Sequence, residues 1–114
     1  MPKFTTGPIE NTGTPSATIN LKFLNNSKST AVVRAKVFHL DGAKRKIFDT
    51  GFLTIDPKSS AFVLNVDVSG EAQYEVQFRS NLSNKEVQFS SWGFRDNGRV
   101  NPSQRVLNSE LTMR

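Results

Sequence analysis

Apolar and polar residues alternate along most of this chain, and the clearest alternation lies in residues 61–79. Two apolar runs are separated there by the Ser-Gly pair at 69–70. Side chains two residues apart point to the same face of a strand, so each run predicts a strand with one apolar and one polar face. We expect the following residues to share a core face in each run: Phe62, Leu64, Val66 and Val68, and then Tyr74, Val76 and Phe78.

The same alternation recurs along the chain at intervals of about 10 to 15 residues, with polar turns between the segments. It predicts further strands at 17–25, 31–40, 46–55, 86–94 and 104–113. Gly51 predicts a bulge in the third of these segments, and Leu107, Leu111 and Met113 share one face of the last. No apolar stripe with helical period persists. The pattern therefore predicts an all-β fold, a single-domain antiparallel β-sandwich of about seven or eight strands with jelly-roll or Greek-key connections.

Residues 1–16 differ from the rest of the chain. They hold three of the five prolines, two glycines and four threonines, and their sizeable apolar groups after the first residue are Phe4 and Ile9. We therefore divide the chain into a flexible N-terminal connector, 1–16, and a β-sandwich domain, 17–114. Two interpretations of the connector stay open: a frayed terminus, or an extended segment that becomes a strand on a neighbouring molecule.

Composition limits the kind of protein this is. With 114 residues, 36% of them hydrophobic, the chain suffices for one domain, and its nine phenylalanines make the core aromatic. The absence of cysteine excludes a disulfide framework, thiolate metal sites and cysteine nucleophiles. No segment has the apolar length of a secretory signal or a membrane span, so we expect synthesis in the cytoplasm and no membrane partner.

The sequence holds little that indicates catalysis. His39 is the single histidine, which excludes histidine triads, and its place beside Asp41-Gly42 suits an ordinary, partly exposed imidazole. The carboxylates are scattered singly, without the tight spacing of a calcium loop. Two carboxylates are enough for a glycosidase, but a thin sandwich leaves little room for a cleft. We expect no enzyme: no catalytic residue, no cofactor and no metal.

Charge adds one possible partner class. Fifteen Lys and Arg against ten Asp and Glu give a formal net charge of +5, which favours anionic surfaces in general. The compact basic run is Lys44-Arg45-Lys46, beside a predicted hairpin turn. A nucleic-acid site needs exposed aromatic residues among its cations, whereas most phenylalanines here occupy predicted core positions. We interpret the run as a solvated hairpin tip and expect no nucleic-acid partner.

Trp92 and Phe94 fall on the strand face opposite Val87 and Phe89. Because both faces of this strand carry large apolar groups, one face must be partly exposed or covered by another element. Three explanations stay open: coverage within the domain, contact with a second subunit, and stacking of a sugar on the exposed aromatic pair.

Residues 37–78 resemble small proteins of spore-forming Firmicutes found in exosporium and endospore-appendage gene neighbourhoods. The motifs are a Val-Phe-x-Leu-x-Gly hairpin at 37–42, a Pro-x-Ser-Ser turn at 57–60, and Asp-Val-Ser-Gly before a Tyr-Glu-Val-Gln-Phe strand at 67–78. The resemblance implies a jelly-roll subunit that stacks into a fibre when its N-terminal connector enters the next subunit. Unlike the best-known appendage subunits, this chain lacks cysteine, so the resemblance implies a fibre or layer joined by strand addition alone.

We therefore predict a self-assembling structural subunit of a spore-surface appendage or fibre, located on the exosporium or appendage. It would form a head-to-tail homo-oligomer through residues 1–16, with other spore-surface proteins as further partners, and an anchor or cap role stays open. The expected subunit interface consists of Phe4, Thr5, Thr6, Ile9, Trp92 and Phe94. The alternatives are a carbohydrate-binding or adhesive β-sandwich module, and a phage or capsid-like structural protein.

Overall fold

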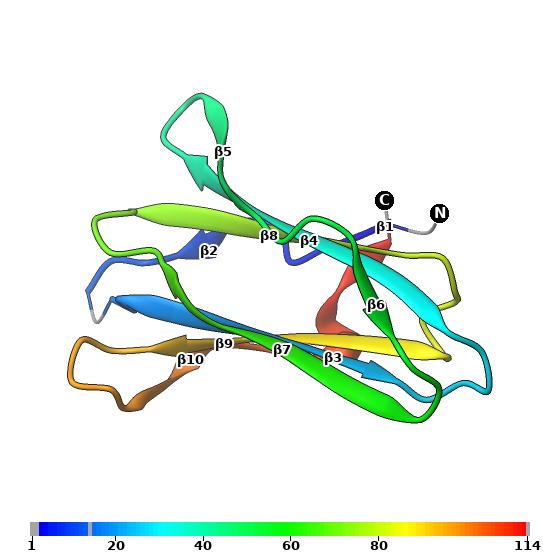
Figure 1. Ribbon diagram of the computed structural model, residues 1–114. Helices are drawn as coiled ribbons and strands as arrows, with labels where there is room; N and C mark the ends of the chain where they lie inside the picture. The colour runs from blue at the N-terminus through cyan, green and yellow to red at the C-terminus, as the bar shows by residue number, and fades with distance from the viewer. Residues whose placement is uncertain (1–2, 14, 114) are drawn as a thin grey trace.

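The computed structural model describes residues 3–13 and 15–113, which form two antiparallel sheets packed face to face (Figure 1). The expected all-β sandwich is confirmed. Four residues lie outside the described part of the chain: Met1, Pro2 and Thr14 of the predicted connector, and Arg114 at the end of the predicted domain. Within the described part of the chain, no helix is long and apolar enough to cross a membrane.

The first sheet has the strand order β11-β1-β8-β4-β5, with β2 also pairing with β8 and β6 with β4. Its strands are β1 (Lys3–Thr5), β2 (Ile9–Glu10), β4 (Ala31–Leu40), β5 (Lys44–Asp49), β6 (Leu53–Ile55), β8 (Gln73–Ser80) and β11 (Thr112–Met113). The second sheet has the order β10-β9-β3-β7. Its strands are β3 (Thr18–Asn25), β7 (Ser59–Asp67), β9 (Val87–Phe94) and β10 (Val100–Val106). A short 3-10 helix, η1 (Asn108–Glu110), lies between β10 and β11.

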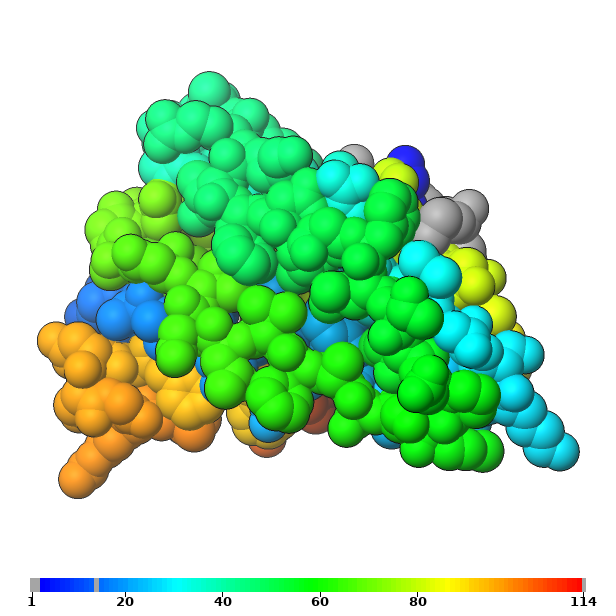
Figure 2. Space-filling view, in the orientation of Figure 1, coloured from blue at the N-terminus to red at the C-terminus, as the bar shows by residue number. Residues whose placement is uncertain are grey.

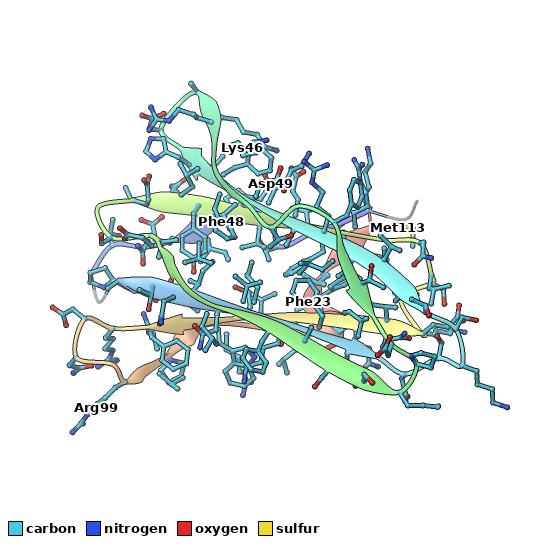
Figure 3. All side chains as sticks on the ribbon, in the orientation of Figure 1. Phe23, Lys46, Phe48, Asp49, Arg99 and Met113 are labelled. Atoms are coloured by element: carbon cyan, nitrogen blue, oxygen red, sulfur yellow. The ribbon has the colours of Figure 1, made fainter. Side chains whose placement is uncertain are left out.

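Phenylalanine rings from both sheets form the centre of the core. Phe78 of β8 stacks on Phe89 of β9 with ring centroids 4.8 Å apart, and Phe23 of β3 meets both rings edge-on. Figure 3 shows Phe23 between the two sheets. The predicted inward faces of β3, β4, β8 and β9 are confirmed by the buried residues Ile19, Leu21, Phe23, Val33, Ala35, Val37, Tyr74, Val76, Phe78, Val87 and Phe89.

The predicted facing of β7 is wrong in its first half. Phe62 is 63% exposed and Leu64 is 49% exposed, whereas Val66 and Val68 are buried as expected. The pairing of β7 with β3 shifts register between Val63 and Val66, where β7 has one more residue than β3. Asn65 lies in this bulge with a φ of +61°. An extra residue reverses the facing of everything before it, which turns Phe62 and Leu64 outward.

The predicted strand at 46–55 is two strands, both on β4. β5 pairs with the end of β4 near Leu40, and β6 pairs with its beginning near Ala31. Gly51 does not form a bulge within one strand but lies between the two, with a φ of +68° that suits glycine. Phe52, which the pattern placed in the strand, is 57% exposed.

The predicted strand at 104–113 is also wrong. β10 begins earlier, at Val100, and its pairing with β9 is irregular after Asn101, where Pro102 has no amide hydrogen to donate. The chain then passes through η1 into β11, and Met113 is 63% exposed rather than buried. The strand number exceeds the prediction because of these interruptions and because the N-terminal segment contributes β1 and β2.

Candidate assembly surfaces

Residues 3–11, here called the arm, lie along one side of β8. Both β1 and β2 pair with β8 in antiparallel register. β11 pairs with the other side of β1, which places Phe4 opposite Met113. In this single chain, the segment predicted to pair with a neighbouring molecule therefore pairs with its own sheet. Without the arm, β8 would present a free strand edge.

The two apolar residues of the arm lie inside the sandwich. Phe4 is 3% exposed and Ile9 is 9% exposed. The Phe4 ring lies 6.0 Å from the Phe89 ring, which belongs to the opposite sheet. Full burial of side chains of this size contributes about 1.5 to 3 kcal/mol each, so these two groups anchor the arm to the domain.

A buried carboxylate joins the arm to β8 on the outer face of the first sheet. Glu75 is 7% exposed. It accepts hydrogen bonds from the Thr5 hydroxyl and from Gln77 Nε2, and its Oε1 lies 2.7 Å from Lys44 Nζ. Burial raises the pKa of Glu75, but the bonds from Lys44, Thr5 and Gln77 together lower that pKa below its usual value. The ionised carboxylate therefore links the arm to the β4–β5 hairpin.

Thr6 completes the pairing of the arm where β1 ends. Its backbone N–H donates to the Val76 carbonyl at 3.0 Å, and its hydroxyl accepts from the Val76 N–H at 3.0 Å. The next residue, Gly7, has a φ of +66° and donates its N–H to the Thr5 hydroxyl at 2.9 Å. The arm thus turns outward between β1 and β2 while the backbone of β8 keeps its hydrogen bonds.

The end of the arm is held by a buried amide. Asn11 is 3% exposed, and its Nδ2 lies 2.9 to 3.2 Å from the carbonyl oxygens of Ser16, Val68 and Glu71. Its Oδ1 accepts from the Ser16 N–H and from Gln104 Nε2, both at 2.7 Å. Because a buried amide left unpaired is costly, this cluster fixes where the arm meets the domain. Sequence reasoning missed it, since Asn11 stands in a polar segment that resembles a loop.

His39 is less ordinary than predicted. Its side chain is 13% exposed and lies between two carboxylates: Nε2 is 2.7 Å from Asp41 Oδ2, and Nδ1 contacts Glu71 Oε2. The hydrogen bond from His39 lowers the pKa of Asp41. The imidazole therefore ties the end of β4 to the turn before β8. Among the described residues, no group of three or more His, Cys, Asp and Glu is placed to hold a metal ion.

Trp92 and Phe94 lie half-buried on the outer face of the second sheet, on the side of β9 opposite Val87 and Phe89 as predicted. Lys22 Nζ lies 5.4 Å and Arg105 Cζ 5.9 Å from the Trp92 ring centroid. These cations come from β3 and β10, the strands on either side of β9. The six predicted interface residues thus form two groups: the arm residues on the first sheet, and this aromatic pair on the second.

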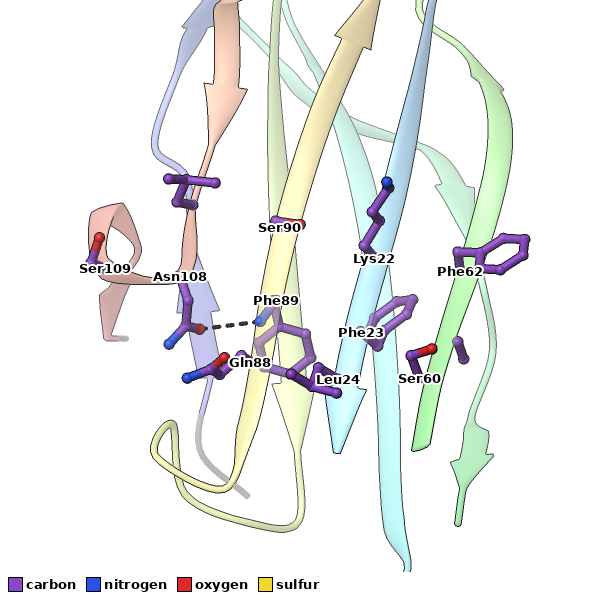
Figure 4. Close-up of a pocket in the computed structure, with 12 residues that line it drawn as sticks. Lys22, Phe23, Leu24, Ser60, Phe62, Gln88, Phe89, Ser90, Asn108 and Ser109 are labelled. Carbon is purple, nitrogen blue, oxygen red and sulfur yellow. Dashed lines mark hydrogen bonds between the residues drawn. The ribbon is translucent and has the colours of Figure 1, made fainter. Parts of the chain in front are cut away.

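A shallow groove of about 710 Å³ crosses the same outer face near the beginning of β9. Its walls include Leu24, Phe62, Gln88 and Asn108 (Figure 4). The Asn108 Oδ1 accepts a hydrogen bond from the Phe89 N–H at 3.1 Å, which holds the loop after β10 against β9. Exposed apolar groups therefore continue from the groove to β7, the last strand of this sheet.

No family model and no curated protein matches this chain. Solved structures do match it. A sensory rhodopsin transducer of Anabaena superposes with a TM-score of 0.51 at 12% identity, covering 79% of this chain and 85% of that one. Thermotoga maritima 1070 superposes with a TM-score of 0.50 at 16% identity, covering 98% of this chain and 90% of that one. At these identities the similarity concerns the fold alone.

Proposed function

We propose that this protein is a self-assembling structural subunit that joins neighbouring copies by exchanging its arm, as a fibre or appendage component of the spore surface. In the assembled form, the arm of one copy occupies the side of β8 of the next. The observation that supports this most is that the arm supplies both a buried pair of anchors and the strand that covers β8. All of these contacts are noncovalent, so a neighbour's arm can make the same ones.

The connection between arm and domain suits such an exchange. Residues 12–15 have the sequence Thr-Gly-Thr-Pro, which contains no apolar anchor. After exchange, Phe4, Ile9 and Asn11 make the same contacts as before, but with the corresponding residues of the neighbouring copy. When every arm passes to the next copy without closing a ring, the product is a filament rather than a dimer.

The closed chain competes with the filament. Its arm is tethered beside β8 at a high effective concentration, whereas a neighbour's arm must come from solution. We therefore expect monomers in dilute protein and filaments in concentrated protein. Exchange should also be slow, because the arm must first withdraw Phe4 and Ile9 from the core.

A disulfide lock tests the proposal. Lys3 and Arg79 lie directly opposite each other in the β1–β8 pairing, and the chain has no cysteine of its own. The double variant Lys3→Cys with Arg79→Cys, oxidised while monomeric, should form no filaments in negative-stain micrographs, and reduction should restore them. The single variant Lys3→Cys, kept reduced, is the control.

The same variant gives a positive readout. Filaments assembled under reducing conditions and then oxidised should run as a ladder of covalent multimers on a non-reducing gel, because each bridge joins two chains. Filaments from the oxidised monomer, or oxidised filaments that run as single chains, would show that the arm does not pass between copies.

A further inference from the structure

The strand β7 is a free sheet edge of unusual composition. It ends the order of the second sheet and pairs with β3 alone among the described residues. Residues 59–64 read Ser-Ser-Ala-Phe-Val-Leu, with no charged side chain. A long, uncharged, apolar edge of this kind offers unpaired backbone N–H and C=O groups to another strand. Figure 2 shows residues of this part of the chain, in green, along the front of the molecule.

The other sheet edges have features that discourage pairing with another strand. β5 contributes the basic run 44–46, and β2, β6 and β11 are only two or three residues long. β10 contains Pro102 and Arg105 and has an irregular register. Lysine, proline, irregularity and short length all discourage edge-to-edge association. In β7 such features are confined to its second half, the bulge at Asn65 and the charged Asp67, and residues 59–63 pair regularly with β3.

We propose that β7 pairs with β7 of a second copy, antiparallel and about a two-fold axis at Phe62. An antiparallel pair sets residues of the same face directly opposite each other. A two-fold axis at Phe62 places Phe62 opposite Phe62 of the partner copy, and Ser60 opposite Leu64 of the partner copy. These side chains all lie on the outer face of the sheet. The pairing then uses residues 60–64 and ends within the bulge, before Asn65.

Charge and exposure favour a second copy as the occupant. Residues 59–64 carry no charge, so two copies of this stretch can lie side by side without like-charge repulsion between them, although each whole chain carries a net charge of +5. Phe62, 63% exposed, and Leu64, 49% exposed, would each lose part of their contact with water against the partner. The contact is separate from arm exchange, since it lies on the other sheet.

Sedimentation velocity of the full chain over a wide range of concentrations tests the proposal, starting from dilute monomer. Phe62→Lys puts two like charges directly opposite each other and should weaken dimerisation by about tenfold or more. Phe52→Lys is the matched control, because Phe52 is similarly exposed, at 57%, but lies between β5 and β6. Circular dichroism should show that both variants keep the fold. Equal dimerisation of Phe62→Lys and the unaltered chain, or no dimer of the unaltered chain, would overturn the proposal.

Cross-linking tests the register. A single Phe62→Cys substitution should give a disulfide dimer on mild oxidation, because the two sulfurs face each other across the axis. Ser60→Cys should cross-link much more slowly, since its opposite residue is Leu64. Equal cross-linking of both variants would refute the register. When Phe62→Lys is combined with Lys3→Cys and Arg79→Cys, the protein should still form the ladder of covalent multimers. A failure of edge pairing can therefore be distinguished from a failure of arm exchange.

Discussion

Replacing Asn65 by valine tests whether the bulge fixes the facing of β7. Asn65 has a φ of +61°, a left-handed conformation that strains a β-branched residue by about 1 to 2 kcal/mol. Its backbone N–H donates to Asn20 Oδ1 at 3.0 Å. A bulge that relaxes to accept valine loses this bond, which contributes about 0.5 to 1.5 kcal/mol. The variant bears either this strain or the loss of the bond, so we expect Asn65→Val to lower the free energy of unfolding by about 1 to 2 kcal/mol.

Urea unfolding followed by circular dichroism measures this change. In a domain of this size the melting temperature should fall by about 4 °C for each kcal/mol. Asn65→Gly is the control, because glycine adopts positive φ without strain and keeps the backbone N–H, so its stability should stay within about 0.5 kcal/mol of the unaltered chain. If the valine variant proves as stable as the glycine variant, the bulge does not constrain the strand as we infer.

Three further outcomes are expected. Val76→Asp should prevent folding and Gln77→Asp should be tolerated, as soluble yield will show, because Val76 is fully buried and Gln77 is partly exposed. The pKa of Asp49 is lowered, chiefly by its hydrogen bonds from Arg34. The ionised carboxylate therefore stabilises the folded protein above the ordinary aspartate pKa of 3.8, and this stabilisation is lost as the pH falls below that value. Asp49→Asn should make acid unfolding less steep. Glycans should leave the fluorescence of Trp92 unchanged, since cations already lie over its ring; a saturable response would favour a sugar-binding module.

Alternation predicts facing where pairing is regular. The inward residues of β4, such as Val33, and of β8, such as Val76, follow the sequence pattern because no extra residue interrupts those segments. One inserted residue in β7 was enough to reverse Phe62 and Leu64. Asn65 carried a usable signal, since asparagine is rare in strands and tolerates positive φ.

The candidate surfaces depend on contacts distant in sequence, which alternation does not encode. The outward placement of Trp92 followed from its spacing from Phe89. The docking of the arm did not follow from local pattern, because residues 3–11 gain their structure from β8, more than sixty residues away. Glu75 looked like an ordinary outward strand residue, and its burial arises from the meeting of the arm and Lys44 over it.

The pairing of β1 with β11 brings the two ends of the described chain together, with Phe4 opposite Met113. The polypeptide can therefore be circularly permuted: a short peptide joins the two ends of this chain, and new ends are opened at the exposed turn around Gly98. The arm then becomes an internal strand of a β11–β1 hairpin, held at both of its ends. Such a permutant should keep the sandwich fold but be unable to exchange its arm with a neighbouring copy. It would provide a form of the domain that does not assemble, for crystallisation or display.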